Sequence, residues 1–281
     1  MSGDSTTTTH YDRATELKRF DDTKARVKGL ADSNPTTIPR IFVHPPQTLA
    51  DLAPSSSSSA RRVSIPVVDL SDLHNRAHQL SLAAREFGFF QIVNHGVPPE
   101  TLDRTISAVK AFHEQPPEVR SRLYRREIGP TGMSYISNFD LHQSQAASWR
   151  DTLQVRLGPT PPLPGQLPEV CAAAVAEWGR EAARLGEVLL GLVGEGLGLP
   201  AGRLTETTCL EGRILVGHYY PYCPEPHRTV GLTSHFDPKA LNVLMHGRVD
   251  GLQVKYDEVW VDVEAVPDAI VVNVGDLLQV K

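Results

Sequence analysis

Two side chains that can bind a metal, His235 and Asp237, stand two residues apart in the segment 233–237 (TSHFD). The run at 230–235 predicts a β-strand, and alternate residues of a strand point to the same face, so we expect the two side chains to emerge together. Two histidines and one carboxylate leave three positions of Fe(II) open, which is enough for a bidentate 2-oxo acid and dioxygen. His235 and Asp237 would supply two of those three ligands.

The His-x-Asp tripeptide is weak support by itself, because His10 and Asp12 repeat it in the polar N-terminal tail, where no scaffold could hold a metal. A solvated strand end therefore competes with a metal site as the explanation for His235 and Asp237. The surrounding sequence has to separate the two explanations.

The elements expected around the pair predict an α+β fold. Short apolar runs between turn residues indicate strands at a spacing typical of an antiparallel sandwich or jelly roll, the double-stranded β-helix. Upstream, apolar residues at helical spacing indicate a helical support layer that includes two buried strands. The predicted core strands are 214–220, 230–235, 241–246, 252–256, 259–263 and 269–274, the upstream strands are 65–70 and 88–94, and the helices are 73–87, 101–113 and 167–197.

The N-terminal part has a different composition. The segment 16–30 carries apolar residues among charges and predicts one surface helix. The connector 34–60 holds five prolines and a serine run, buries too little apolar surface to fold by itself, and contains 55–59, which we interpret as a mobile linker. Three regions are therefore predicted: an N-terminal helix and linker at 1–62, a mixed helix and strand region at 63–205, and the jelly-roll core at 206–281.

Composition argues against several classes of partner. The net charge of −5 comes from 28 basic and 33 acidic residues spread along the chain, which gives no basic stripe for nucleic acid or an anionic membrane. Three widely spaced cysteines argue against a disulfide framework or a structural zinc site. Without a secretory signal or an apolar run of bilayer-spanning length, we expect a cytoplasmic protein with a small-molecule substrate. The oligomeric state is not predicted.

The segment 218–226 (HYYPYCPEP), one hairpin before His235, resembles the Asn/His-Tyr-Tyr-Pro-x-Cys-Pro signature of the plant iron(II)- and 2-oxoglutarate-dependent dioxygenases. Further segments resemble the same family in the same order along the chain, and such collinear agreement is highly specific. Within the family they are most similar to the branch with desacetoxyvindoline 4-hydroxylase, the benzoxazinoid-glucoside dioxygenase and the aminocyclopropane-carboxylate oxidase homologues. These segments are 17–30 (LKRFDDTKARVKGL), 38–46 (IPRIFVHPP), 87–98 (FGFFQIVNHGVP), 149–153 (WRDTL), 251–254 (GLQV) and 272–279 (VNVGDLLQ).

The resemblance implies roles for four residues. His235 and Asp237 would be iron ligands, and Tyr220 would hydrogen-bond the carboxylate of 2-oxoglutarate. His218 occupies a position where many relatives have an Asn near the co-substrate, so it is either a contact of the cofactor site or a packed strand histidine. The complete family protein uses Fe(II) and 2-oxoglutarate, with ascorbate in support, to oxidise a C–H bond, most often by hydroxylation. The branch implies a small specialised plant metabolite as the substrate.

Other conspicuous residues have structural explanations. His95 stands in a turn after a buried strand. For Trp149 and Arg150, which the resemblance places near the substrate mouth, core packing and a surface ion pair are the default expectations. Cys223 is expected to be a small buried residue without a redox role, and His246 to be a loop histidine.

The C-terminal part departs from the family pattern. Relatives place a distal iron-binding His about 50 to 60 residues after the first, and an Arg-x-Ser about ten further on, which completes the facial triad and the co-substrate clamp. Only 46 residues follow His235, no His follows His246 and no Arg follows Arg248. We therefore expect the last strands of the jelly roll to be missing, with 269–274 left as an exposed apolar edge. The ending at 279–281 (QVK) could be encoded like a splice donor, and we hypothesise a retained or mispredicted intron.

Two alternatives to a dioxygenase follow from this departure. The chain could be a non-catalytic fragment, because two ligands would hold iron weakly and 2-oxoglutarate would lack its Arg clamp. It could also be a metal-free jelly-roll binding module, which leaves Tyr220, His235 and Asp237 unexplained. Iron binding, and succinate release from 2-oxoglutarate, distinguish the three hypotheses.

Overall fold

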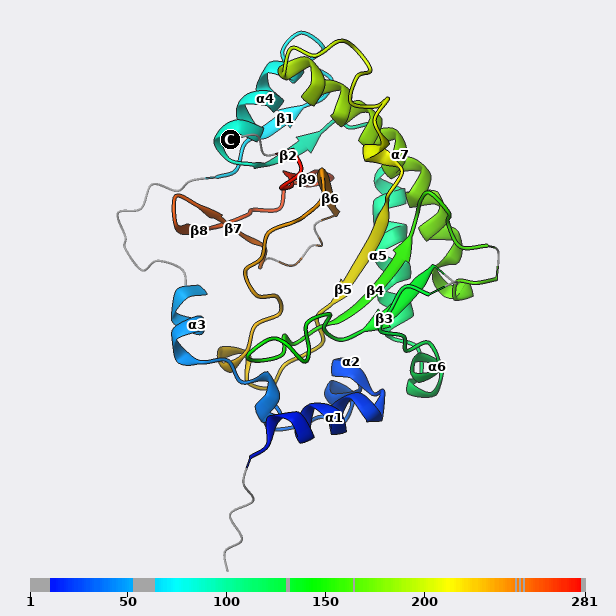
Figure 1. Cartoon of the computed structure of the whole chain (residues 1–281), viewed down its shortest axis with the longest axis vertical. Helices are drawn as coiled ribbons and strands as arrows, with labels where there is room; N and C mark the ends of the chain where they lie inside the picture. Colours follow the sequence, from blue (N-terminus) through cyan, green and yellow to red (C-terminus); the bar gives the residue numbers. More distant parts are fainter. Residues whose placement is uncertain are drawn as a thin grey trace, which may run out of the picture.

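The computed structural model describes residues 11–52, 64–129, 132–163, 165–245, 247, 249 and 251–278. Its strands group into a four-stranded sheet in the order β1-β2-β9-β6, a three-stranded sheet in the order β3-β4-β5, and the hairpin β7-β8 (Figure 1). Helices and sheets are segregated, so the fold is α+β as predicted. The strands are β1 Val67–Asp69, β2 Phe89–Val93, β3 Met133–Ile136, β4 Asp151–Arg156, β5 Ile214–Tyr219, β6 Leu241–Met245, β7 Gln253–Tyr256, β8 Val259–Asp262 and β9 Ile270–Val274.

Three helices form the predicted support layer. The long helix α7 packs against α5 beside the β3-β4-β5 sheet, and α4 packs on α7 and β2 (Figure 1). Val175, Trp178, Leu185 and Leu189 of α7 are buried at helical spacing, and each such burial stabilises the fold by about 1.5–3 kcal/mol. The sequence prediction of this layer is confirmed. The helices are α4 Arg76–Glu86, α5 Pro99–His113 and α7 Glu169–Gly196; the short α6, Pro117–Arg122, follows α5.

The two faces of strand β5 have different surroundings. Leu215 is buried toward the helices, and a Cβ atom on Gly217 would lie 2.6 Å from Cγ1 of Val109 in α5, so only glycine fits there. The alternate residues Val216 and His218 are exposed, because successive residues of a strand point to opposite faces. β5 therefore keeps one face open to solvent and the other closed by α5.

Strand β9 is central in its sheet. It pairs antiparallel with β2 on one side and with β6 on the other, which places Ile270 opposite Ile92 and Val272 opposite Val243. All five residues of β9 are buried. The prediction that 269–274 forms an exposed apolar edge is therefore wrong, because two strands distant in the sequence cover both of its edges.

The N-terminal segment forms two helices, α1 (Arg13–Thr23) and α2 (Arg26–Asp32), where the sequence predicted one. Lys24 and Arg26 have φ angles of 53° and 63°, in the left-handed region that interrupts a right-handed helix. Amphipathic spacing alone did not reveal this break.

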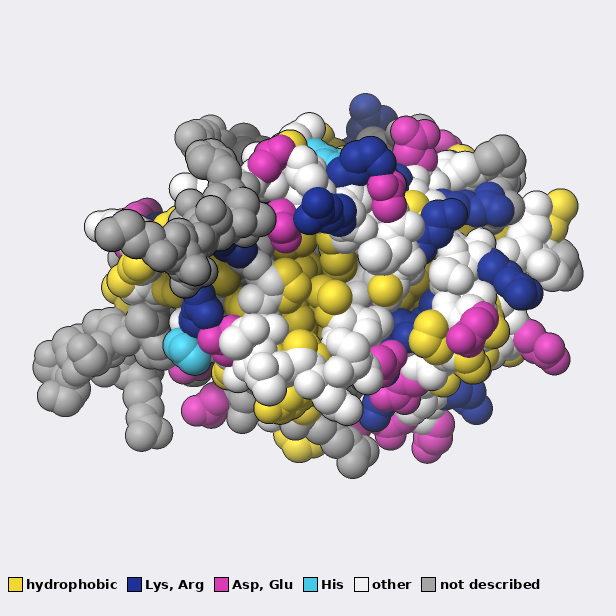
Figure 2. All heavy atoms as spheres, turned by 90° about the horizontal axis from the view of Figure 1, so that it is seen from below, with side chains coloured by type: hydrophobic (Ala, Val, Ile, Leu, Met, Phe, Trp, Pro, Cys, Tyr) yellow, Lys and Arg dark blue, Asp and Glu magenta, His cyan; other side chains and the backbone are white. Residues whose placement is uncertain are grey.

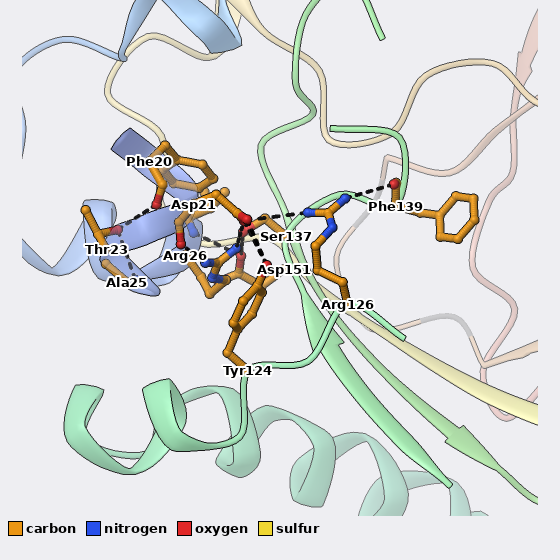
Figure 3. Close-up of polar contacts among 11 residues, drawn as sticks. Phe20, Asp21, Thr23, Ala25, Arg26, Tyr124, Arg126, Ser137, Phe139 and Asp151 are labelled. Carbon is orange, nitrogen blue, oxygen red and sulfur yellow. Dashed lines mark hydrogen bonds and ion pairs between the residues drawn. The ribbon is translucent and has the colours of Figure 1, made fainter. Parts of the chain in front are cut away.

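A buried polar network fastens these helices to β4. Asp151 is fully buried and accepts hydrogen bonds from the backbone N–H groups of Val27, at 2.9 Å, and Lys28, at 2.8 Å. The hydroxyl of Ser137 donates to the same carboxylate at 2.7 Å (Figure 3). One carboxylate thereby caps the first turn of α2, whose N–H groups have no partner within the helix.

Arg26 extends this network. Its fully buried guanidinium pairs with Asp21 at 3.0 Å and lies 4.0 Å from the ring centroid of Tyr124, and the Tyr124 hydroxyl also donates to Asp21 (Figure 3). The pKa of Asp21 is lowered overall, since hydrogen bonds from Arg26 and Tyr124 and the charge of Arg26 outweigh the opposing effect of burial. The charge on α1 is therefore compensated where the helices meet the body.

The connector 34–60 folds in part against the rest of the chain. Ile41 and Phe42 are buried in one cluster with Trp149. This agrees with a connector that does not fold by itself, because apolar side chains distant in the sequence complete the burial. The predicted linker 55–59 lies outside the described residues. The elements of the connector are η1 Arg40–Phe42 and α3 Pro46–Leu52.

The surface on the side of α1 and α3 mixes both signs of charge. Figure 2 shows Lys and Arg side chains interspersed with Asp and Glu around a patch of hydrophobic side chains. Side chains of both charges are therefore exposed close together on this face. Within the described ranges, none of the helices has the length and apolar character needed to span a bilayer.

Candidate metal centre

His235 and Asp237 lie in an irregular loop, 230–240, so the strand predicted at 230–235 is wrong. The two side chains nevertheless meet, with Nε2 of His235 3.7 Å from Oδ1 of Asp237. The proximity of the two side chains therefore results from the contacts that hold the loop, and not from the alternation of side chains along a strand.

The start of the loop is fixed by the residues just before β4. Trp149 donates its backbone N–H to the carbonyl of Val230 at 2.8 Å, and Arg150 donates from Nη1 to the carbonyl of Gly231 at 3.1 Å. These bonds satisfy backbone groups that a sheet would otherwise have to pair. The beginning of the loop is therefore anchored to the β3-β4-β5 sheet.

The end of the loop is fixed by the residues after β9. Gly275 donates its N–H to the carbonyl of Ala240 at 2.9 Å, and Asp276 donates to the carbonyl of Asp237 at 3.0 Å. A Cβ atom on Gly275 would overlap the carbonyl oxygen of Lys239, so glycine is required by this close approach. The loop is thus held between the two sheets.

Each candidate ligand has one atom engaged by the protein and one left free. Nδ1 of His235 lies 3.0 Å from the carbonyl of Thr233; since a carbonyl only accepts, Nδ1 carries a proton, and in the neutral ring the lone pair is then on Nε2. Asn273 of β9 donates from Nδ2 to Oδ2 of Asp237 at 3.0 Å, which leaves Oδ1 facing the histidine. Contacts of this kind set the tautomer and orientation of metal ligands.

The donor set fits a divalent ion such as Fe(II). Metal bonds of about 2.1 Å, usual for imidazole and carboxylate ligands, can span the observed separation of Nε2 and Oδ1. The side chains of His235 and Asp237 are 50% and 33% exposed, so an ion and further ligands can reach them. Among the described residues no group of three His, Cys, Asp or Glu side chains could hold a metal, and His246 lies outside those residues.

Tyr220 and His218 lie at the end of β5, next to β4. Oγ1 of Thr152 lies 3.0 Å from Nδ1 of His218, its partner across the strands. Desolvation by the surrounding protein, together with the charge of Arg150, lowers the pKa of His218 to about 3 and keeps the ring neutral. Both side chains keep water-accessible surface, and the ring of Tyr220 would lie 2.7 Å from a Cβ atom placed on Gly231. The structure thus brings Tyr220 against the base of the loop.

Arg150 is buried, so the surface ion pair expected for it is wrong. Its side chain hydrogen-bonds the carbonyl of Gly231, and Asp140, the acidic residue that acts on it electrostatically, forms no ion pair with it among the described contacts. The expectation of core packing for Trp149 is confirmed, because its ring meets the Phe42 ring edge-on at 5.1 Å. Trp149 therefore packs in the apolar core, whereas Arg150 is buried beside the loop.

The structural explanations of other residues hold. Nδ1 of His95 accepts from the N–H of Val97 at 3.1 Å within the turn, and Nε2 donates to the carbonyl of the distant Asp268 at 2.9 Å, so both ring nitrogens are used. Cys223 is a partly buried free thiol beside the N-terminal cluster. Among the described residues, neither forms a group of three possible metal ligands with His235 and Asp237.

Sequence reasoning missed three residues of the site, Asn273, Gly275 and Thr152. The first two lie in 272–279 (VNVGDLLQ), where an amide and a glycine interrupt a buried apolar run. That interruption was the available signal. Thr152 carried no signal, because a threonine in a strand is ordinary.

Known proteins match nearly the whole chain. The N-terminal model of the non-haem dioxygenases named for morphine synthesis matches residues 65–170, and the model of the 2OG-Fe(II) oxygenase superfamily matches residues 211–280. The 1-aminocyclopropane-1-carboxylate oxidase homolog 1 of Arabidopsis thaliana is 46% identical over 275 residues, which cover 95% of this chain and 74% of the relative. Deacetoxyvindoline 4-hydroxylase of Catharanthus roseus is 38% identical over 271 residues, which cover 94% of this chain and 67% of that protein.

Structural comparison agrees. The crystal structure of JOX2 in complex with 2OG, Fe and JA matches with a TM-score of 0.77 and 29% identity, over 90% of this chain and 74% of that one. The predicted plant family, jelly-roll fold, and cofactors Fe(II) and 2-oxoglutarate are confirmed. The family's activity is Fe(II)- and 2-oxoglutarate-dependent oxygenation of small molecules. The chain belongs to the 2OG-Fe(II) oxygenase superfamily.

Proposed function

We propose that this chain oxidises a small specialised plant metabolite and that His235 and Asp237 are two of its iron ligands. The observation that carries the assignment is the orientation of the pair. Thr233 and Asn273 occupy Nδ1 and Oδ2, and the remaining atoms, Nε2 and Oδ1, face each other at 3.7 Å. A merely solvated loop would not require both side chains to be oriented in this complementary way.

Bound iron would supply the redox chemistry that couples decarboxylation of 2-oxoglutarate by dioxygen to oxidation of the substrate. Tyr220 is proposed to donate a hydrogen bond from its hydroxyl to a carboxylate of 2-oxoglutarate. Desolvation raises the pKa of Tyr220, against an opposing effect of Arg150, so the hydroxyl remains a donor. His218, neutral and close to Thr152 on the same strand face, is proposed as a second contact of the co-substrate.

We propose a separate role for each of the three predicted regions. Residues 206–281 carry the candidate ligands, 63–205 supply β4 and the helices behind it, and the described part of 1–62 packs against both through α2 and the connector. The three cysteines are free thiols, which supports a cytoplasmic location, and ascorbate is proposed to keep the iron reduced. Imaging of a fluorescent fusion in plant cells tests the location.

Metal binding by the purified chain tests the ligands. Anaerobic calorimetric titration with Co(II), which is stable and spectroscopically visible, should give an affinity that falls at least about tenfold in His235→Ala and in Asp237→Ala. His74→Ala, which removes an exposed histidine before α4, is the control and should leave Co(II) affinity unchanged. Equal Co(II) affinity in the wild type and His235→Ala would contradict the assignment.

Succinate release from 2-oxoglutarate measures the activity itself. The purified chain with Fe(II), ascorbate and dioxygen should form succinate, and His235→Ala should abolish this formation. Co(II) binding without any succinate from the Fe(II) form would support the non-catalytic alternative. Absence of both would favour the metal-free binding module.

A further inference from the structure

Arg150 holds a buried positive charge whose hydrogen-bonding groups are only partly used. Its side chain is 8% exposed, and Nη1 donates to the carbonyl of Gly231 at 3.1 Å. Nε is buried without any partner, and no described residue accepts from Nη2. A buried charge that is not matched by an acceptor is costly. The Nη2 side of the guanidinium is therefore suited to a hydrogen-bond acceptor that enters from outside.

The register of β4 and β5 shows which way this group faces. Thr152 pairs with His218 and Asp151 with Tyr219, so Arg150 and Tyr220, one residue beyond the end of each strand, come next in this register. Both also contact Gly231: Arg150 bonds its carbonyl, and the Tyr220 ring covers its Cα. Arg150 and Tyr220 therefore share the open face of β5 at the base of the metal-binding loop.

The charges around Arg150 agree with this placement. Arg150 lowers the pKa of His218 and opposes the rise in the pKa of Tyr220, which shows that its charge is felt on that face. Asp140 is the acidic group that acts on Arg150, and it does so without an ion pair among the described residues. The charge of Arg150 is therefore not neutralised by an ion pair with a described residue.

We propose that Arg150 and the hydroxyl of Tyr220 form a receptor for a carboxylate beside the metal centre. Nη2, from which no described residue accepts, can donate to a carboxylate oxygen, while the bond from Nη1 to Gly231 fixes the plane of the guanidinium. The inference rests on the proposed function, and the carboxylate belongs either to 2-oxoglutarate or to an acidic organic substrate.

The test uses the metal-free chain, so that it can be read whether or not the metal site binds an ion. Binding of 2-oxoglutarate, 2-oxobutanoate, phenylacetate and methyl phenylacetate is measured by calorimetry for the wild type and Arg150→Met. Arg203→Met, an exposed arginine in the turn after α7, is the control for the change in net charge. Thermal melting verifies that each variant is folded.

Either source of the carboxylate predicts a distinct pattern. If the carboxylate belongs to the co-substrate, Arg150→Met lowers the affinity for 2-oxoglutarate at least about tenfold. The affinity for 2-oxobutanoate, which lacks the second carboxylate, stays unchanged. If it belongs to a substrate, the wild type prefers phenylacetate to its neutral ester, and Arg150→Met removes that preference. Equal affinities of the wild type and Arg150→Met for every probe would overturn the proposal.

A second variant separates this role from the anchoring of the loop. Arg150→Lys keeps a donor and a charge near Gly231 but cannot offer the planar fork. Carboxylate affinity that falls in Arg150→Lys while Co(II) affinity stays at the wild-type level supports a receptor. A role confined to anchoring Gly231 would lower Co(II) affinity in Arg150→Met, restore it in Arg150→Lys, and leave carboxylate affinity the same in all three proteins.

Discussion

Replacing Asp151 by alanine should detach the N-terminal helices from the body. The carboxylate is fully buried and accepts from three donors, the N–H groups of Val27 and Lys28 and the hydroxyl of Ser137 (Figure 3). Each buried donor left without a partner costs about 1–3 kcal/mol, and water entering the vacated space recovers part of this. We therefore expect the free energy of unfolding to fall by about 3–5 kcal/mol, a large value for one substitution.

Urea denaturation followed by tryptophan fluorescence gives this change, and limited proteolysis shows where the chain opens. Cleavage between α1 and α2 should accelerate in Asp151→Ala before the rest of the chain is cut. Ser137→Ala is the matched control, because it removes one donor and keeps the cap of α2, and it should cost about 1 kcal/mol. A loss below about 1 kcal/mol in Asp151→Ala, with unchanged cleavage, would refute the argument that this carboxylate fastens the helices.

Three further predictions concern the loop and the core. Asn273→Leu should weaken Co(II) binding about 10- to 100-fold in calorimetry, because Asp237 loses the donor that orients it; unchanged affinity would contradict this role. Gly275→Ala should displace the carbonyl of Lys239 and lower the melting temperature by several degrees, since a Cβ has no space there; a wild-type melting curve would show that the approach is looser. Burial lowers the pKa of His113 to about 3, so the neutral form stabilises the fold above the unfolded value of about 6.5, and this stability is lost progressively as the pH falls toward 3. The slope of unfolding free energy between pH 6.5 and 5 should therefore be shallower in His113→Phe, by up to about 1.4 kcal/mol per pH unit, and equal slopes would contradict the inference.

Local pattern predicted these regular elements well. The helices found as α4, α5 and α7 follow from apolar residues at helical spacing, and the strands found as β2, β5 and β9 follow from short apolar runs bounded by turn residues, of which β9 is buried throughout. The strand predicted at 230–235 is wrong, because backbone groups of the loop 230–240 bond to residues before β4 and after β9. No local pattern encodes partners that lie so far away in the sequence.

The candidate site divides in the same way. The sequence by itself determined the donor types at His235 and Asp237, the resemblance that gives them a function, and the helical layer that supports them. Only the tertiary structure decided that these residues occupy a loop, that Asn273 orients the carboxylate, and that Arg150 is buried beside Tyr220. The physical reason is that residue type fixes what an atom can donate or accept, whereas its orientation and burial depend on which distant segments pack around it.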